Sequence, residues 1–81
     1  MTGKLRMHDV VALLEATRAK HFESGEPILL RRGQIGTVVM TYEDGACDVE
    51  FADRNGRTYA ILSILPDSLL VLHETPEHTA A

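Results

Sequence analysis

Apolar and polar residues alternate through the middle of the chain, which is the pattern of half-buried β-strands. Residues 33–42, 46–52 and 57–65 are rich in β-branched and aromatic residues, so we predict a strand in each segment. Asp44-Gly45 and Asn55-Gly56 separate the segments, and both dipeptides favour the positive φ angles of tight hairpin turns. The central part of the chain is therefore predicted to form a three-stranded meander.

The segment after the meander contains one strong break. Pro66 ends the third strand because proline lacks an N–H and fixes φ, and a single 3₁₀ turn fits the space that follows it. Residues 69–73 form a short apolar run, which we predict to be the last strand. Residues 74–81 offer no large apolar side chain to bury, and we expect a frayed tail.

The N-terminal third allows two interpretations. Residues 9–19 suit an amphipathic helix capped by Asp9, but Val10-Val11 followed by Leu13-Leu14 also suits a short buried strand. Periodicity does not separate the two for so short a run, so both stay open here. Residues 24–27 (SGEP) favour a loop.

The predicted hairpins also indicate which side chains face inward. A two-residue loop at Asp44-Gly45 pairs Met40 with Val49 and Val38 with Phe51. A loop of two or four residues at the second turn gives the same parity and adds Thr58 to the inner face. The predicted inner set is Val38, Met40, Cys47, Val49, Phe51, Ala60 and Leu62, with Tyr42 as a candidate extension.

The predicted outer face is unusually apolar. It contains Ile35 together with a cluster that we predict to bind a partner protein: Val39, Asp48, Glu50, Tyr59 and Ile61. A contiguous exposed apolar patch is typical of an interaction site. The alternative is that the preceding loop covers this patch through Phe22, Ile28, Leu29 or Leu30, since so small a domain needs most of its large apolar groups for its core.

Size, cysteine content and charge narrow the function. The chain has 81 residues, enough for one domain, and its single cysteine, Cys47, excludes an internal disulfide and favours a reducing cytoplasm. No apolar run approaches the roughly 18–20 residues that span a bilayer. The net charge of −4 divides unevenly: residues 1–32 hold six basic and four acidic residues, residues 33–81 two and eight. The acidic body disfavours nucleic acid, which the basic N-terminal segment leaves as an alternative.

The residue types of common catalytic and metal sites are present without their spacing. No two of the four histidines stand four residues apart, and no C-x-x-C occurs, so we expect no metal and no cofactor. Cys47 is predicted to face the core, where a thiol is inert. Asp48 and Glu50 share a strand face roughly 6.5–7 Å apart, but no cleft is indicated around them. We therefore expect no enzymatic activity.

Several segments, taken in order, resemble a known family. They are DVVALLE (9–15), RGQIGTVV (32–39), YEDG (42–45), VEF (49–51) and NGRTYA (55–60), and they resemble the small bacterial proteins grouped as domain of unknown function 4926. The resemblance spans residues 9–72 and implies a mostly-β fold, a small five-stranded SH3-like barrel similar to KOW and Tudor modules. It implies that residues 9–15 are the first strand, residues 16–31 a long first loop, and residues 66–69 the 3₁₀ turn before the last strand.

Our expectation is therefore a barrel domain over residues 9–73 with flexible ends at 1–8 and 74–81. The resemblance implies no catalytic residues and suggests the neutralising partner of a toxin–antitoxin-like or immunity-like pair. We expect a cytoplasmic protein-binding module with an unidentified protein partner, no membrane, and a homodimer as an open option. The alternative is a KOW-like nucleic-acid-binding module, with contacts from Arg18, Lys20, Arg31, Arg32, Arg54 and Arg57.

Overall fold

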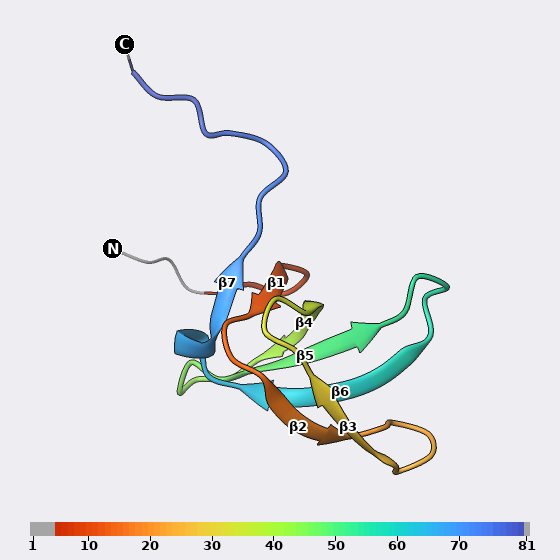
Figure 1. Cartoon of the computed structure of the whole chain (residues 1–81). Coiled ribbons are helices and arrows are strands. Elements are labelled where there is room, and N and C mark those ends of the chain that lie inside the picture. The colour runs from red at the N-terminus through yellow and green to blue at the C-terminus, as the bar shows by residue number, and fades with distance from the viewer. Residues whose placement is uncertain (1–4, 81) are drawn as a thin grey trace.

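The computed structural model describes residues 5–80, which contain seven short strands and one 3₁₀ turn (Figure 1). The elements are β1 (Val10–Leu13), β2 (Thr17–Lys20), β3 (Pro27–Leu30), β4 (Ile35–Thr41), β5 (Cys47–Ala52), β6 (Thr58–Ile64), η1 (Pro66–Ser68) and β7 (Leu69–Val71). Five strands form one antiparallel sheet in the order β6-β5-β4-β1-β7, and β2 pairs with β3 separately. The prediction of a mostly-β fold is confirmed, but within residues 5–80 β6 and β7 do not pair, so the sheet is not closed into a barrel.

The meander and the turn after it lie where the sequence predicts them. Strands β4, β5 and β6 fall inside the three predicted segments, and η1 precedes the last strand. After β7 the chain leaves the sheet as an extended tail without regular structure (Figure 1). In the N-terminal segment 1–8, residues 1–4 lie outside the described residues, and Leu5 packs against the core.

The N-terminal third forms strands, not a helix. β1 lies between β4 and β7 and pairs with both, so its backbone hydrogen bonds are made on two edges. Residues 16–31, expected to be a long loop, form the β2–β3 hairpin instead. Together β1 and β2 run antiparallel to β3 and β4 as one ribbon, bent where residues 14–16 pass residues 31–34.

The bend of this ribbon folds the β2–β3 hairpin over the inner face of the sheet. Ala19, Ile28 and Leu30 pack against the core, and Leu30 is fully buried. The backbone N–H of Phe22, just after β2, donates to the carbonyl of Tyr59 on β6 at 2.7 Å. The ribbon therefore supplies both a part of the sheet and its cover.

The core contains most of the predicted inner set. Val38, Cys47, Val49, Phe51 and Ala60 are buried, and Leu62 is half-buried against them. The ribbon and the last strand complete the cluster with four residues, Val11, Leu13, Leu30 and Leu69.

Met40 and Tyr42 are exceptions, because both are about half exposed. The first hairpin has a three-residue loop: the Tyr42 N–H donates to the Ala46 carbonyl at 2.9 Å, and Met40 pairs with Asp48. A loop with one more residue than expected turns Met40 to the outer face. A β-bulge at Val39 then turns the side chains back, so that Val38 faces inward as predicted but pairs with Val49 and not with Phe51.

The second hairpin repeats this arrangement. The Asp53 N–H donates to the Arg57 carbonyl at 2.9 Å, which again leaves a three-residue loop, and Ala52 pairs with Thr58. A bulge follows, after which Phe51 pairs with Ala60 as expected. Thr58 is consequently on the outer face, which corrects the prediction that it faces inward.

Gly36 lies directly against core side chains of the meander. It lies on β4, which belongs to both the ribbon and the meander, and it is buried. A Cβ at this position would lie 2.6 Å from Val49 Cγ1 and 2.9 Å from the ring of Phe51. Because Gly36 has no side chain, Val49 and Phe51 can occupy the space that a Cβ would need.

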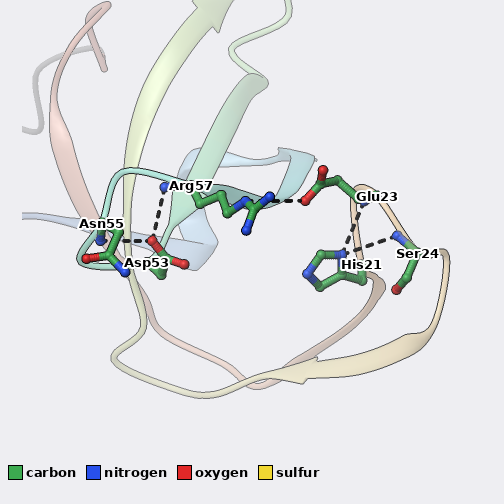
Figure 2. A network of polar contacts seen from close by, with 6 residues as sticks. All are labelled: His21, Glu23, Ser24, Asp53, Asn55 and Arg57. Carbon is green, nitrogen blue, oxygen red and sulfur yellow. Dashed lines mark hydrogen bonds and ion pairs between the residues drawn. The ribbon is translucent and has the colours of Figure 1, made fainter.

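A small polar network joins the hairpin tip to the turn between β5 and β6 (Figure 2). Arg57 Nε lies 3.7 Å from a carboxylate oxygen of Glu23, and both side chains are largely exposed. At the tip, Nδ1 of His21 accepts the backbone N–H groups of Glu23 at 3.2 Å and Ser24 at 3.4 Å (Figure 2). In the facing turn, Asp53 Oδ1 accepts the N–H of Arg57 at 3.0 Å.

Candidate functional site

The outer face of the five-stranded sheet is the candidate site. Strand pairing places Ile61 of β6 beside Glu50 of β5, Glu50 beside Thr37 of β4, and Thr37 beside Val10 of β1. This row crosses the sheet on the side opposite the core. We name its β5–β6 end the acidic half and its β1–β7 end the aliphatic half.

The acidic half consists of Asp48 and Glu50 with Met40 and Ile61 beside them. Met40 pairs with Asp48 and is 47% exposed, and Ile61 pairs with Glu50 and is 41% exposed. Two apolar side chains on the surface thus flank two carboxylates at alternate positions of one strand.

Hydroxyl groups hold both carboxylates in place. Ser63 Oγ donates to Asp48 Oδ1 at 2.5 Å, and the Tyr42 hydroxyl donates to Asp48 Oδ2 at 2.7 Å. Thr58 Oγ1 donates to Glu50 Oε2. Each donor lies on a neighbouring strand or at its end, so the pairing of β4, β5 and β6 fixes the position of the charges.

These hydrogen bonds shift the titration of two groups. The hydroxyls of Ser63 and then Tyr42 lower the pKa of Asp48, because they stabilise the ionised form. The same bond to Asp48 raises the pKa of Tyr42, with smaller contributions from burial and the carboxylate charge. Asp48 therefore adds to stability above its unfolded pKa and loses that contribution as the pH falls toward its lower, folded value.

Of the five residues predicted to bind a partner, the structure brings three together on the outer face. Asp48, Glu50 and Ile61 lie side by side there, and Val39 is the half-buried residue of the first bulge. Tyr59 is not part of this face. It packs against the core with its ring 6.4 Å from that of Phe51, and its hydroxyl accepts Gln34 Nε2 at 2.5 Å.

The reason for the displacement of Tyr59 is the second bulge, which inserts it between the pairs formed by Thr58 and Ala60. The alternative that residues 16–31 cover the outer patch is wrong in its placement of that segment. Ile28 and Leu30 pack on the core side, whereas Phe22 and Leu29 stay exposed.

Sequence reasoning missed most of the aliphatic half. Its exposed side chains are Val10 and Leu14 from the β1 segment, Ile35 from β4, and Leu70 and Leu72 from the β7 segment. Only Ile35 was expected on the outer face. The alternation of Val10, Ala12 and Leu14 carries the signal, but it is readable only once this segment is known to be a strand.

A family model described as "Domain of unknown function (DUF4926)" matches residues 7–71, which is most of the chain. The chain belongs to this family. No curated protein and no solved structure matches the sequence. Membership in a family of unknown function assigns no activity, so the function is argued from the surface of the protein.

Other chemistry at the surface is limited. Burial, and then the charge of Asp48, raise the pKa of the Cys47 thiol, which keeps it protonated and unreactive. Within residues 5–80 no three His, Cys, Asp or Glu side chains gather as metal ligands, and no helix there is long and apolar enough to cross a membrane. A shallow hollow lies over residues 31–34 at the bend of the ribbon.

The six basic residues named for the nucleic-acid alternative lie in three separate places. Arg18 and Lys20 are exposed on β2, residues 31–32 are at the bend, and Arg54 and Arg57 are in the second turn. Arg57 faces Glu23. The six residues come from three segments of the chain, and one of them faces an acid, whereas a nucleic-acid-binding surface usually presents a continuous basic stripe.

Proposed function

We propose that this protein is a non-catalytic protein-binding module whose acidic half receives a basic partner. The observation that carries the proposal is the position of Asp48, which is held by Ser63 and Tyr42 beside the exposed side chains of Met40 and Ile61. A partner that fits this surface presents Lys or Arg side chains next to an apolar ridge.

The acidic half is preorganised to receive a cation. A carboxylate already fixed by two hydroxyl donors loses little conformational freedom when a cation reaches it, so more of the attraction is retained as affinity. The negative charge also raises the association rate of a basic partner and excludes acidic ones. Met40 and Ile61 add apolar area that only a partner can remove from water.

The family resemblance extends this proposal to a biological setting. It suggests the neutralising member of a toxin–antitoxin-like or immunity-like pair in a bacterial cytoplasm, where an acidic surface would suit a basic toxin. It also suggests an SH3-like architecture. The strand order β6-β5-β4-β1-β7 and the 3₁₀ turn before β7 support that architecture, although the sheet stays open between β6 and β7.

Binding of nucleic acid is the competing function and makes a different prediction. Phosphate contacts would come from the basic residues of the ribbon and the second turn, on surfaces other than the acidic half. Its affinity would fall steeply with salt and would respond to Arg18→Ala, while Asp48→Lys would leave it unchanged or strengthen it.

The test begins with affinity capture using the full chain, followed by identification and purification of the captured protein. Titration calorimetry then measures its dissociation constant with wild type, Asp48→Lys and Ile61→Glu. We expect each substitution to weaken binding by about tenfold or more, because one reverses a charge at the contact and the other buries an unpaired carboxylate.

Asp67→Lys is the matched control. Asp67 is an exposed acid on η1, which is not one of the strands that form the acidic half, and its substitution changes the net charge of the protein by the same amount. Circular dichroism verifies that each variant is folded. If Asp48→Lys and Asp67→Lys weaken binding equally, attraction by net charge explains the complex and the proposed site is wrong.

A further inference from the structure

The aliphatic half is a second surface with a different character. Ala12 on β1 pairs with Ile35 on β4 and with Leu70 on β7, and Val10 accepts the backbone N–H of Leu72 at 2.8 Å. Val10 and Ala12 alternate along β1 with the buried Val11 and Leu13, so they and their strand partners lie on the face opposite the core; Val10 is 42% exposed and Ala12 7%. Three adjacent strands thus present one aliphatic surface to solvent.

The size of this surface is compatible with a small dimer interface. Val10, Leu14, Ile35, Leu70 and Leu72 are each between 36% and 57% exposed. Together they expose on the order of 400 Å² of apolar area, within the range of the largest patch on a monomer. Two such surfaces with a polar rim would bury on the order of 1,200 Å² in total, which is at the lower limit of stable interfaces.

The distribution of charge favours an identical copy as the occupant. No side chain of the aliphatic half is charged, so two copies meet there without repulsion. Glu50, the acid paired into the middle of this face, lies on β5, two strands away from β1. Adjacent strands are about 4.8 Å apart, which places Glu50 about 10 Å to one side of β1.

Charge also selects the orientation of the two copies. With the two-fold axis parallel to β1, β4 of one copy covers β7 of the other, and the two Glu50 carboxylates lie on opposite sides, about 20 Å apart. That separation exceeds the screening length of about 8 Å at physiological salt. With the axis across the strands, β5 would face β5 and the acids would meet.

We propose that a second copy of this chain covers the aliphatic half, with β1 packed face to face on β1 and the two-fold axis parallel to these strands. The acidic halves then extend from opposite sides of the dimer and stay accessible. The proposal is independent of the function assigned to the acidic half, since the two surfaces lie at different ends of the sheet.

Sedimentation equilibrium of the full chain from about 1 μM to about 1 mM tests this proposal. We expect a dimer with a dissociation constant on the order of 10 μM, as suits an interface of this size. Leu70→Glu should weaken it by at least about tenfold, because the carboxylate would be buried without a partner. Leu29→Glu is the control, since Leu29 is 59% exposed on the separate β2–β3 hairpin.

Two further measurements make the test decisive. Glu50→Lys should change the dimer constant by less than about threefold with the axis along β1, and a larger change would overturn this orientation. A monomer throughout the concentration range, or equal effects of Leu70→Glu and Leu29→Glu, would overturn the dimer. Leu70→Glu should leave binding of the identified partner intact and Asp48→Lys should leave the dimer intact, so failure of one proposal is separable from failure of the other.

Discussion

The N-terminal ribbon (β1 to β4) and the meander (β4 to β6) both bend around the core, but the bends have different structural origins. In the ribbon the register never changes: the two residue numbers of every pair add up to 47, from Val10 with Thr37 to Lys20 with Pro27. In the meander each hairpin changes register once, at a bulge near its three-residue loop. At the bend of the ribbon Leu13 forms backbone hydrogen bonds with both Gly33 and Gln34, and the same register resumes beyond it, whereas the meander bends by adding a residue to one strand.

This difference determines which face a side chain occupies. Because the ribbon keeps its register, Val11, Ala19 and Leu30 all lie on its concave side and pack on one core. In the meander the odd loop reverses the faces and the bulge reverses them again. Met40, Tyr42 and Thr58, which lie between a bulge and a loop, are displaced, and so is Tyr59 at the second bulge itself. The alternation of inward and outward side chains in the meander is therefore disturbed only near its two loops.

The largest expected effect concerns Gly36, where ribbon and meander share β4. Gly36→Ala should destabilise the fold by about 2–3 kcal/mol, because the new Cβ would overlap Val49 Cγ1 and the buried ring of Phe51. Urea denaturation followed by circular dichroism measures the loss. A double variant with Val49→Ala should lose less than the sum of the two single variants, since it removes the nearer obstacle. Additive losses would show that the two regions are less tightly packed than their contact implies.

An intermediate effect is expected at the two loops of the meander. Gly45 and Gly56 have φ angles of +93° and +81°, and a Cβ at either position would meet no atom closer than 3.8 Å. Alanine at each should therefore cost about 1 kcal/mol from backbone strain alone, measured as a shift of the urea midpoint. Asparagine, which tolerates positive φ, should cost less at both positions. A clearly unequal response would mean that the two hairpins differ in more than sequence.

The smallest effect is expected where the ribbon tip meets the second turn. Glu23→Gln removes the charge that faces Arg57, and both side chains are more than half exposed (Figure 2). The free energy of unfolding should change by less than about 0.5 kcal/mol, with no further loss in high salt. A loss above 1 kcal/mol would contradict the view that apolar contacts of Ile28 and Leu30, rather than this ion pair, hold the ribbon over the sheet.

Prediction from sequence succeeded where the signal is local. The three strands of the meander, the positions of its turns and the 3₁₀ turn at Pro66 follow from residue types alone. At the candidate site, the outward positions of Asp48, Glu50 and Ile61 were predicted correctly. In each hairpin the extra loop residue reverses the orientation of the side chains, and the bulge reverses it again. Tyr59 was misplaced because a bulge is decided by packing on both faces, which a strand pattern does not contain.

The alternation of side chains and the glycine turns are properties of the chain itself, and they determined that residues 33–65 would form a meander with Val49 and Phe51 inside. Tertiary structure decided the rest. β1 became a strand because β4 and β7 supply hydrogen-bonding partners on both of its edges, and those partners are distant in sequence. Only that assembly creates the continuous outer face, since Val10, Ile35 and Leu70 become neighbours through pairing alone.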